Sequence, residues 1–206
     1  ARVLVRDGRA AGVELEDGEV VAARRVAANV NPRLLFEQLV PADAVPADFR
    51  ARIAAYKCGS GTFRMNVALS ALPDFSCLPG AEARPHHASG IVCAPSLAYM
   101  ERAYFDARTD GWSRAPIVEV LIPSVVDDTL APPGQHVASL FCQHVHPEVD
   151  GGWDAHRETV ANLMIDTVDT WAPNFRRSVL GYQALSPLDL ERTFGLIGGD
   201  IFHGAL

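Results

Sequence analysis

The sequence predicts an α+β fold: a mixed, largely antiparallel sheet with helices packed on one face, and a small N-terminal β-meander. Three observations indicate this class. Strand-like and helix-like segments are interleaved along the 206 residues. Several neighbouring strand segments are joined by loops alone, which favours an α+β sheet over repeated βαβ units. The best helical segment, 154–172, carries its apolar residues on one stripe, as expected for a helix that covers a core.

The stretch from Arg2 to Pro32 predicts three short strands joined by two tight turns. Alternating apolar residues lead into Asp7-Gly8 and again into Asp17-Gly18. An Asp-Gly pair between such runs indicates a hairpin, because glycine adopts positive φ without steric cost. A meander this small cannot bury its own apolar face. We therefore expect the chain to be a piece of a larger protein.

The remaining elements follow from apolar spacing and from cap residues. Asn31 and Pro32 are the expected N-cap and first residue of a helix. The alternation in 61–69 puts the apolar side chains on one face of a strand and Arg64 and Asn66 on the other. In all, helices are predicted at 33–40, 46–56, 96–110, 154–172 and from 187, and strands at 61–69, 90–94, 117–122, 137–145 and 178–185.

Two segments allow more specific expectations about individual side chains. In 96–110, Leu97, Met100 and Tyr104 recur at helical spacing, with Ser96 as the cap. His86-His87 follows a proline in a loop, and adjacent side chains in a loop rarely converge. We expect both of these histidines to be exposed.

Two parts of the chain resemble the phytoene desaturase-like FAD-dependent oxidoreductases. The N-terminal motifs are DGRAAGV and LEDGEVVAARRV, and the C-terminal run is SPLDLERTFGLIGGDIFHG. The resemblance implies that residues 1–31 are a β-meander fragment of an FAD-binding domain and that 32–206 form a substrate-binding domain. It also implies FAD in the full-length parent.

The family's glycine-rich pyrophosphate turn, however, is absent from this chain. The near-match Gly59 to Arg64 has arginine in place of the third glycine and precedes an expected strand. The glycine-rich C-terminal segment of the family is missing as well. We therefore expect no FAD bound to this chain alone.

The resemblance places four residues near the flavin: Asn29, Asn31, Gly199 and His203. Glycines on both sides of His203 allow a close approach of the backbone. Two interpretations of His203 stay open. It either orients substrate or tunes the flavin, or it hydrogen-bonds its own loop.

Candidates for the substrate pocket are Lys57, Arg64, His144 and His203. Lys57 and Arg64 flank the turn at residues 59–61, where a cation would bind a carboxylate; the alternative is a solvated surface charge. His144 and His146 are two residues apart on a strand and so share a face. A metal site needs a further ligand that the sequence does not supply, so no metal is predicted and a polar strand face is favoured.

Composition restricts the partners. The net charge of −7 and the absence of a basic cluster argue against nucleic acid. Four scattered cysteines without a C-x-x-C pair favour buried thiols and a cytoplasmic location. The expected partners are an apolar small-molecule substrate and the missing FAD-domain segments of the same chain. A homodimer through an exposed strand edge and membrane-surface association of the parent are further options.

The leading functional hypothesis is the substrate-binding part of an FAD-dependent dehydrogenase or desaturase, inactive as this fragment. The parent would transfer a hydride to the flavin, while the protein binds and orients the substrate. Phe63, Met65, Phe105, Trp112 and Phe141 are candidate pocket walls. The alternative is a stand-alone ligand-binding or interaction module without redox activity.

Overall fold

The computed structural model describes residues 1–59, 61–80, 82–202 and 204, and the chain forms two compact units. One unit is Ala1–Cys58 with the end of the chain from Asp200, and the other is Gly59–Gly199. The boundary expected at residue 31 concerns the domains of a larger protein, and it stays a prediction. None of the helices within these described residues is long and apolar enough to cross a bilayer.

The first unit begins with the three-stranded meander that the sequence predicts. Strands β1 (Arg2–Arg6), β2 (Arg9–Glu14) and β3 (Val20–Ala22) pair antiparallel in that order. Asp7 and Gly8 both have positive φ, 50° and 70°, as the tight turn between β1 and β2 requires. Val20 and Val21 remain 54% and 44% exposed, so the described residues leave this apolar surface largely uncovered.

Three helical segments complete the first unit. They are η1 (Leu34–Leu39), which has π-helical hydrogen bonding, η2 (Ala42–Ala44) and α1 (Ala47–Ala54). The Asn31 side chain caps the first of them, since its Oδ1 accepts a hydrogen bond from the Arg33 backbone N–H at 2.8 Å. Phe36 and Phe49 join η1 to α1 through an edge-to-face contact, with ring centroids 4.9 Å apart.

The second unit is built on a five-stranded antiparallel sheet, and the predicted α+β class is confirmed. The strand order is β5 (Ile91–Cys93), β6 (Trp112–Leu121), β7 (His136–Val145), β4 (Thr62–Leu69) and β8 (Val179–Leu185). The α-helices of this unit are α2 (Leu97–Asp110), α3 (Trp153–Trp171), the short α4 (Phe175–Ser178) and α5 (Pro187–Phe194). Single turns occur at η3 (Pro85–Ala88), η4 (Pro123–Val125), η5 (Asp128–Leu130) and η6 (Ile197–Gly199).

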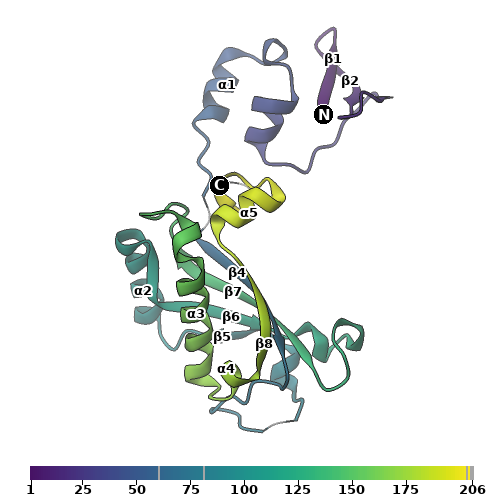
Figure 1. The fold of residues 1–206 in the computed structure, drawn as a ribbon. Coiled ribbons are helices and arrows are strands. Elements are labelled where there is room, and N and C mark those ends of the chain that lie inside the picture. The colour runs from purple at the N-terminus through teal and green to yellow at the C-terminus, as the bar shows by residue number, and fades with distance from the viewer. Residues whose placement is uncertain (60, 81, 203, 205–206) are drawn as a thin grey trace. The chain divides into compact units, whose positions relative to one another are not determined.

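Helix α3 lies across one face of this sheet and closes the hydrophobic core (Figure 1). The alternation predicted for β4 is confirmed, because Phe63, Met65, Val67 and Leu69 are all at most 1% exposed. The core side chains of α3 that meet the sheet are Trp153, Val160, Ala161, Met164, Ile165 and Val168. Each large apolar side chain buried in this way contributes about 1.5–3 kcal/mol to folding.

Helix α2 buries a different face from the one that its sequence suggests. The apolar residues that recur at helical spacing do not form the buried face, since Leu97 is 83% exposed and Tyr104 is 43% exposed. Ala103 and Ala107 are buried instead, and the Tyr99 hydroxyl donates to the Pro116 carbonyl of β6 at 2.8 Å. The helix lies so close to β6 that only small side chains fit between them.

The exposure expected for His86 and His87 is also wrong, because His87 is fully buried and His86 is partly buried. Their ring centroids lie 4.0 Å apart, with the ring planes tilted by 41°. His87 accepts from the Arg84 backbone N–H through Nδ1 and meets the Pro73 carbonyl through Nε2. These two contacts fold the loop back on itself. His86 Nε2 and His136 Nδ1 are buried and find no hydrogen-bond partner among the described residues.

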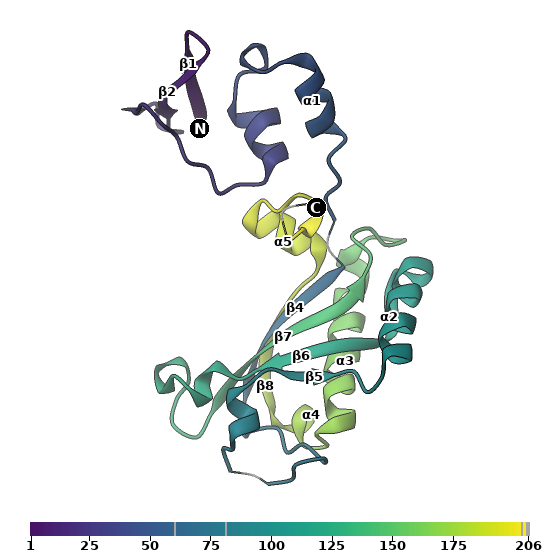
Figure 2. The same cartoon turned by 180° about the vertical axis from the view of Figure 1, so that it is seen from behind.

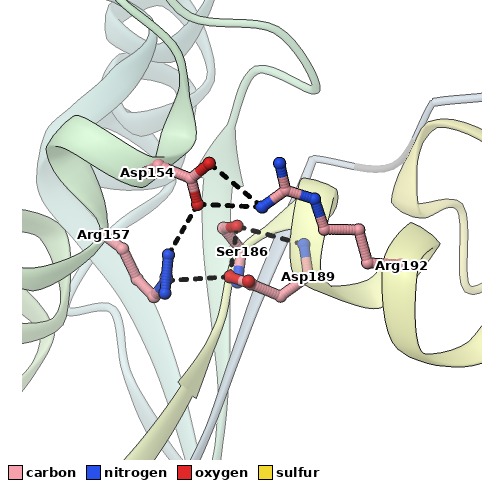
Figure 3. A network of polar contacts seen from close by, with 5 residues as sticks. All are labelled: Asp154, Arg157, Ser186, Asp189 and Arg192. Atoms are coloured by element: carbon pink, nitrogen blue, oxygen red, sulfur yellow. Dashed lines mark hydrogen bonds and ion pairs between the residues drawn. The ribbon is translucent and has the colours of Figure 1, made fainter.

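A polar network fixes α5 to the start of α3 (Figure 3). Asp189 accepts from Arg157 Nε at 3.0 Å and from the Ser186 backbone N–H at 3.0 Å, and also from the Ser186 hydroxyl. Ser186 in turn accepts from the Asp189 N–H, which completes a capping box at the start of α5. Asp154 bridges Arg157 and Arg192 in more exposed surroundings.

We expect Asp189→Ala to lower the free energy of unfolding of the second unit by about 1–3 kcal/mol, because Ser186 and the half-buried Arg157 lose their acceptor. Asp154→Ala is the matched control and removes a carboxylate that also pairs with Arg157 but lies in solvent. Urea unfolding of both variants measures the difference. Equal losses in the two variants would contradict a special role for Asp189.

Stability is also expected to fall as the pH drops below the ordinary histidine pKa of about 6.5. Burial lowers the pKa of His86 and of His136, and the charge of the neighbouring His87 lowers both pKa values further. The unfolded chain therefore binds protons first, near the ordinary histidine pKa of about 6.5. Stability is complete above that pH and is lost as the pH falls toward the lowered values. Urea midpoints of the wild type and of a His86→Leu/His136→Leu variant test this, and an equally steep decline in both would refute it.

Candidate functional site: the open face of the sheet

The face of the five-stranded sheet opposite α3 is the candidate site, and we call it the open face. Figure 2 shows the strands in front of α3 from this side. The pairing register places one residue of every strand directly opposite its neighbour, so that all five share this face. This set, the Arg64 row, runs across the sheet as Val92, Glu119, Phe141, Arg64 and Leu185.

Arg64 is the fourth residue of that row, between Phe141 and Leu185, and is held in place by its neighbours. Its guanidinium carbon is 5.3 Å from the centroid of the Phe141 ring, and Nη2 donates to the Ser139 hydroxyl at 2.9 Å. Both partners come from β7, which is an inner strand of the sheet. Among the described residues, no carboxylate lies within ion-pair distance of Arg64. The charge is therefore positioned by the sheet but is not neutralised by it.

The rest of the open face mixes apolar and amide side chains. A second row runs parallel to the first through Leu121, Ser139, Asn66 and Gln183. The Asn66 amide donates to the Gln183 side-chain oxygen at 3.5 Å. Leu121 and Val92 are 42% and 56% exposed, which is unusual for large apolar residues on a sheet. A surface of this composition suits a mostly apolar ligand that carries a few polar atoms.

The other predicted pocket residues lie in separate places. Lys57 is exposed and belongs to the first unit. His144, at the end of β7, packs edge-on against Tyr104 of α2 with ring centroids 5.5 Å apart, and burial lowers its pKa. Of the residues predicted for the substrate pocket, Arg64 is therefore the one that the described part of the second unit places on the open face, beside apolar and polar side chains that could contact a ligand.

The histidine pair predicted on one strand face is not brought together. His146 lies beyond the end of β7, and its Nδ1 contacts the backbone of Glu148. It lines a polar surface groove of about 460 Å³ together with Trp112 and His156. His144 does not line this groove. Over the described part of the chain, no three histidine, cysteine, aspartate or glutamate side chains are grouped as a metal ion would require.

The residues expected near a flavin differ in where the structure places them. Asn31 is buried in the first unit, where its side-chain N–H donates to Cys58 Sγ at 3.4 Å, whereas Asn29 is exposed. Gly199 has a φ of 65°, and a Cβ there would collide with the Pro187 backbone, so glycine is required for this turn. His203 lies outside the described residues.

Some members of the open face could not be named from the sequence. Phe141 was a candidate wall and does lie beside Arg64, but Phe63 and Met65 point into the core. Ser139 and Glu119 carried no signal of their own, since their place depends on the register between strands far apart in sequence. The alternation around Arg64 and Asn66 was the one local sign of a polar face.

Comparison with known proteins finds relatives that are named as oxidoreductases. No family model matches the chain. The chain is 40% identical over 208 aligned residues to proteins from Rattus norvegicus and Mus musculus named pyridine nucleotide-disulfide oxidoreductase domain-containing protein 2. The match covers 97% of this chain and 36% of each relative, so the chain spans about a third of their length.

A solved structure shares the fold. It is an oxidoreductase from Methanosarcina mazei, similar with a TM-score of 0.55 at 18% identity, and the match covers 90% of this chain and 36% of that one. At this identity the likeness shows the shared fold alone.

Proposed function

We propose that this chain is the substrate-binding part of an FAD-dependent oxidoreductase, and that the open face of its sheet forms one wall of the substrate pocket. The observation that carries the proposal is the Arg64 row: a part of the sheet face opposite α3 that stays partly or fully exposed and combines apolar side chains with a positioned cation. The 40% identity to proteins named as oxidoreductases supports the redox class.

The described residues fit the substrate side of such a pocket better than the nucleotide side. Gly59 and Gly61 precede strand β4, whereas a pyrophosphate-binding turn follows a strand and opens a helix. The open face, in contrast, offers Phe141 and Leu185 for apolar contact and amide side chains for polar atoms. When bound, the flavin would accept a hydride from a substrate carbon. The residues of this chain would bind and orient the substrate and exclude water from it.

The relatives' name also mentions a disulfide, and the cysteines of this chain bear on that point. Cys58, Cys77, Cys93 and Cys142 are all free. Burial raises the pKa of the Cys93 thiol to about 11, and burial also raises that of Cys142. A buried thiol with a raised pKa is a poor nucleophile for disulfide exchange. We therefore assign binding of a mostly apolar substrate to this part of the protein, and no disulfide exchange to Cys93 and Cys142.

The proposal is tested on the longer protein of which, we propose, this chain is part. After purification it should carry flavin visible in its absorbance spectrum, whereas the 206-residue chain alone should retain none after gel filtration with FAD. Released FAD is quantified against protein concentration. A folded full-length protein that stays colourless after reconstitution with FAD, and still binds apolar ligands, would favour the alternative of a binding module without redox activity.

A second test concerns the wall itself. Leu185→Asp places a charge at the edge of the Arg64 row and should raise the KM or Kd of an apolar substrate, because the substrate would have to desolvate a carboxylate. Leu180→Asp is the matched control: Leu180 lies on the same strand, is 57% exposed and is not part of the Arg64 row. Flavin content should be unchanged in both variants. Equal loss of substrate binding in the two would contradict the placement of the wall.

A further inference from the structure

The geometry points to Arg64 as the residue that binds a carboxylate on the substrate. The substrate would then be amphipathic, with an acidic end at Arg64 and an apolar body along the open face. This inference rests on the proposed function and deepens it by giving the chemical class of the ligand. Its starting point is a cation that the described residues position but leave without a carboxylate partner.

The hydrogen-bonding capacity of Arg64 carries the first step. A guanidinium has five N–H donors in a fixed fork, and the fork matches the two oxygens of a carboxylate. The structure uses one Nη2 donor for Ser139, and the ring face of Phe141 takes up one side of the guanidinium plane. The donors that remain include those needed for a bidentate carboxylate.

The anchoring of Arg64 carries the second step. An arginine free in solvent loses much side-chain entropy when it binds a ligand, which weakens the interaction. Here β4 is an inner strand whose flanking residues Phe63 and Met65 are buried in the core, so the backbone of Arg64 is fixed. Ser139 and Phe141 restrict its side chain as well. Part of the ordering cost is thus met before a ligand arrives.

The surroundings decide between a simple anion and an amphipathic acid. Phe141 and Leu185 lie on either side of Arg64 in its row. Beyond Phe141 the row continues to Glu119, whose charge would repel a second anionic group. An acid with one carboxylate and an apolar body satisfies these neighbours, whereas an inorganic dianion or a dicarboxylate meets Glu119. A substrate with no polar end would leave the cation buried without a partner, which is costly.

The test uses the full-length protein and three probes of equal chain length: decanoate, decan-1-ol and decylamine. Isothermal titration calorimetry measures each Kd, and flavin content is measured separately by absorbance. We expect decanoate to bind more tightly than the alcohol or the amine. Arg64→Gln should weaken decanoate binding about tenfold to a hundredfold, which is the range for a hydrogen bond to a charged group. It should leave the Kd of decan-1-ol nearly unchanged.

Three further variants control for charge and folding. Arg64→Lys keeps the charge but loses the fork, so it should fall between wild type and Arg64→Gln. Arg177→Ala removes an exposed cation of α4, which is not part of the Arg64 row, and its decanoate Kd should equal that of the wild type. Glu119→Gln should tighten decanoate binding, because it removes a like charge from the row. Circular dichroism and flavin content confirm that each variant is folded.

The outcomes separate this inference from the proposed function. Loss of decanoate selectivity in Arg64→Gln, with flavin retained, supports both. Equal affinities for the three probes, or equal decanoate Kd values in Arg64→Gln and Arg177→Ala, would overturn the carboxylate site while leaving the flavin assignment standing. A colourless protein that still binds decanoate through Arg64 would overturn the oxidoreductase role and keep the site.

Discussion

Everything in the second unit depends on the contact between α3 and one face of the five-stranded sheet. Phe63, Met65, Val67 and Leu69 of β4 are almost fully buried there, and so are Val160 and Met164 of the helix. Because side chains of a strand alternate, the residues around Arg64 on the opposite face are not part of this core, although the same face is buried farther along at Ile117 and Thr62. The open face therefore carries residues that a core would exclude, such as Arg64 and Glu119. A binding surface needs a rigid support and side chains that can be chosen for the ligand, and here the packed core and the open face supply them.

The same constraint explains how Arg64 is prepared for a ligand. Its backbone cannot move without disturbing Phe63 and Met65, so the side chain starts from a fixed point. Phe141 and Ser139 then come from the neighbouring strand, also an inner one. A lone surface arginine would gain little from an ion pair because of entropy and solvent screening. The position of Arg64 on a packed sheet is what makes it more than a solvated charge.

Local sequence patterns predicted the elements well and the contacts between them less well. The alternation in β4 and the Asp7-Gly8 turn depend on neighbours within a few residues, and the structure confirms both. The apolar residues at helical spacing on α2 are not the ones that the helix buries. Helical spacing also fits Ala103 and Ala107, and the close approach to β6 favours these small side chains. His87 was taken for an exposed residue because its partners Arg84 and Pro73 form a loop that no periodicity reveals. The Arg64 row could not be predicted in full, since it depends on the register of five strands.

The network around Asp189 connects α5, which follows the sheet, to the helix α3 that packs on the sheet. The end of β8 leads directly into the Ser186 cap, and Asp189 joins that cap to Arg157 on α3. The helix that backs the sheet is thus also the anchor of α5, which ends at Gly195 and is followed by the turn where Gly199 meets Pro187. A loosened α3 would therefore disturb both the support of Arg64 and the segment that leads to the end of the chain. For this reason the half-buried Arg157–Asp189 pair matters more to the site than its exposed neighbour Arg192–Asp154, although neither pair lies on the open face.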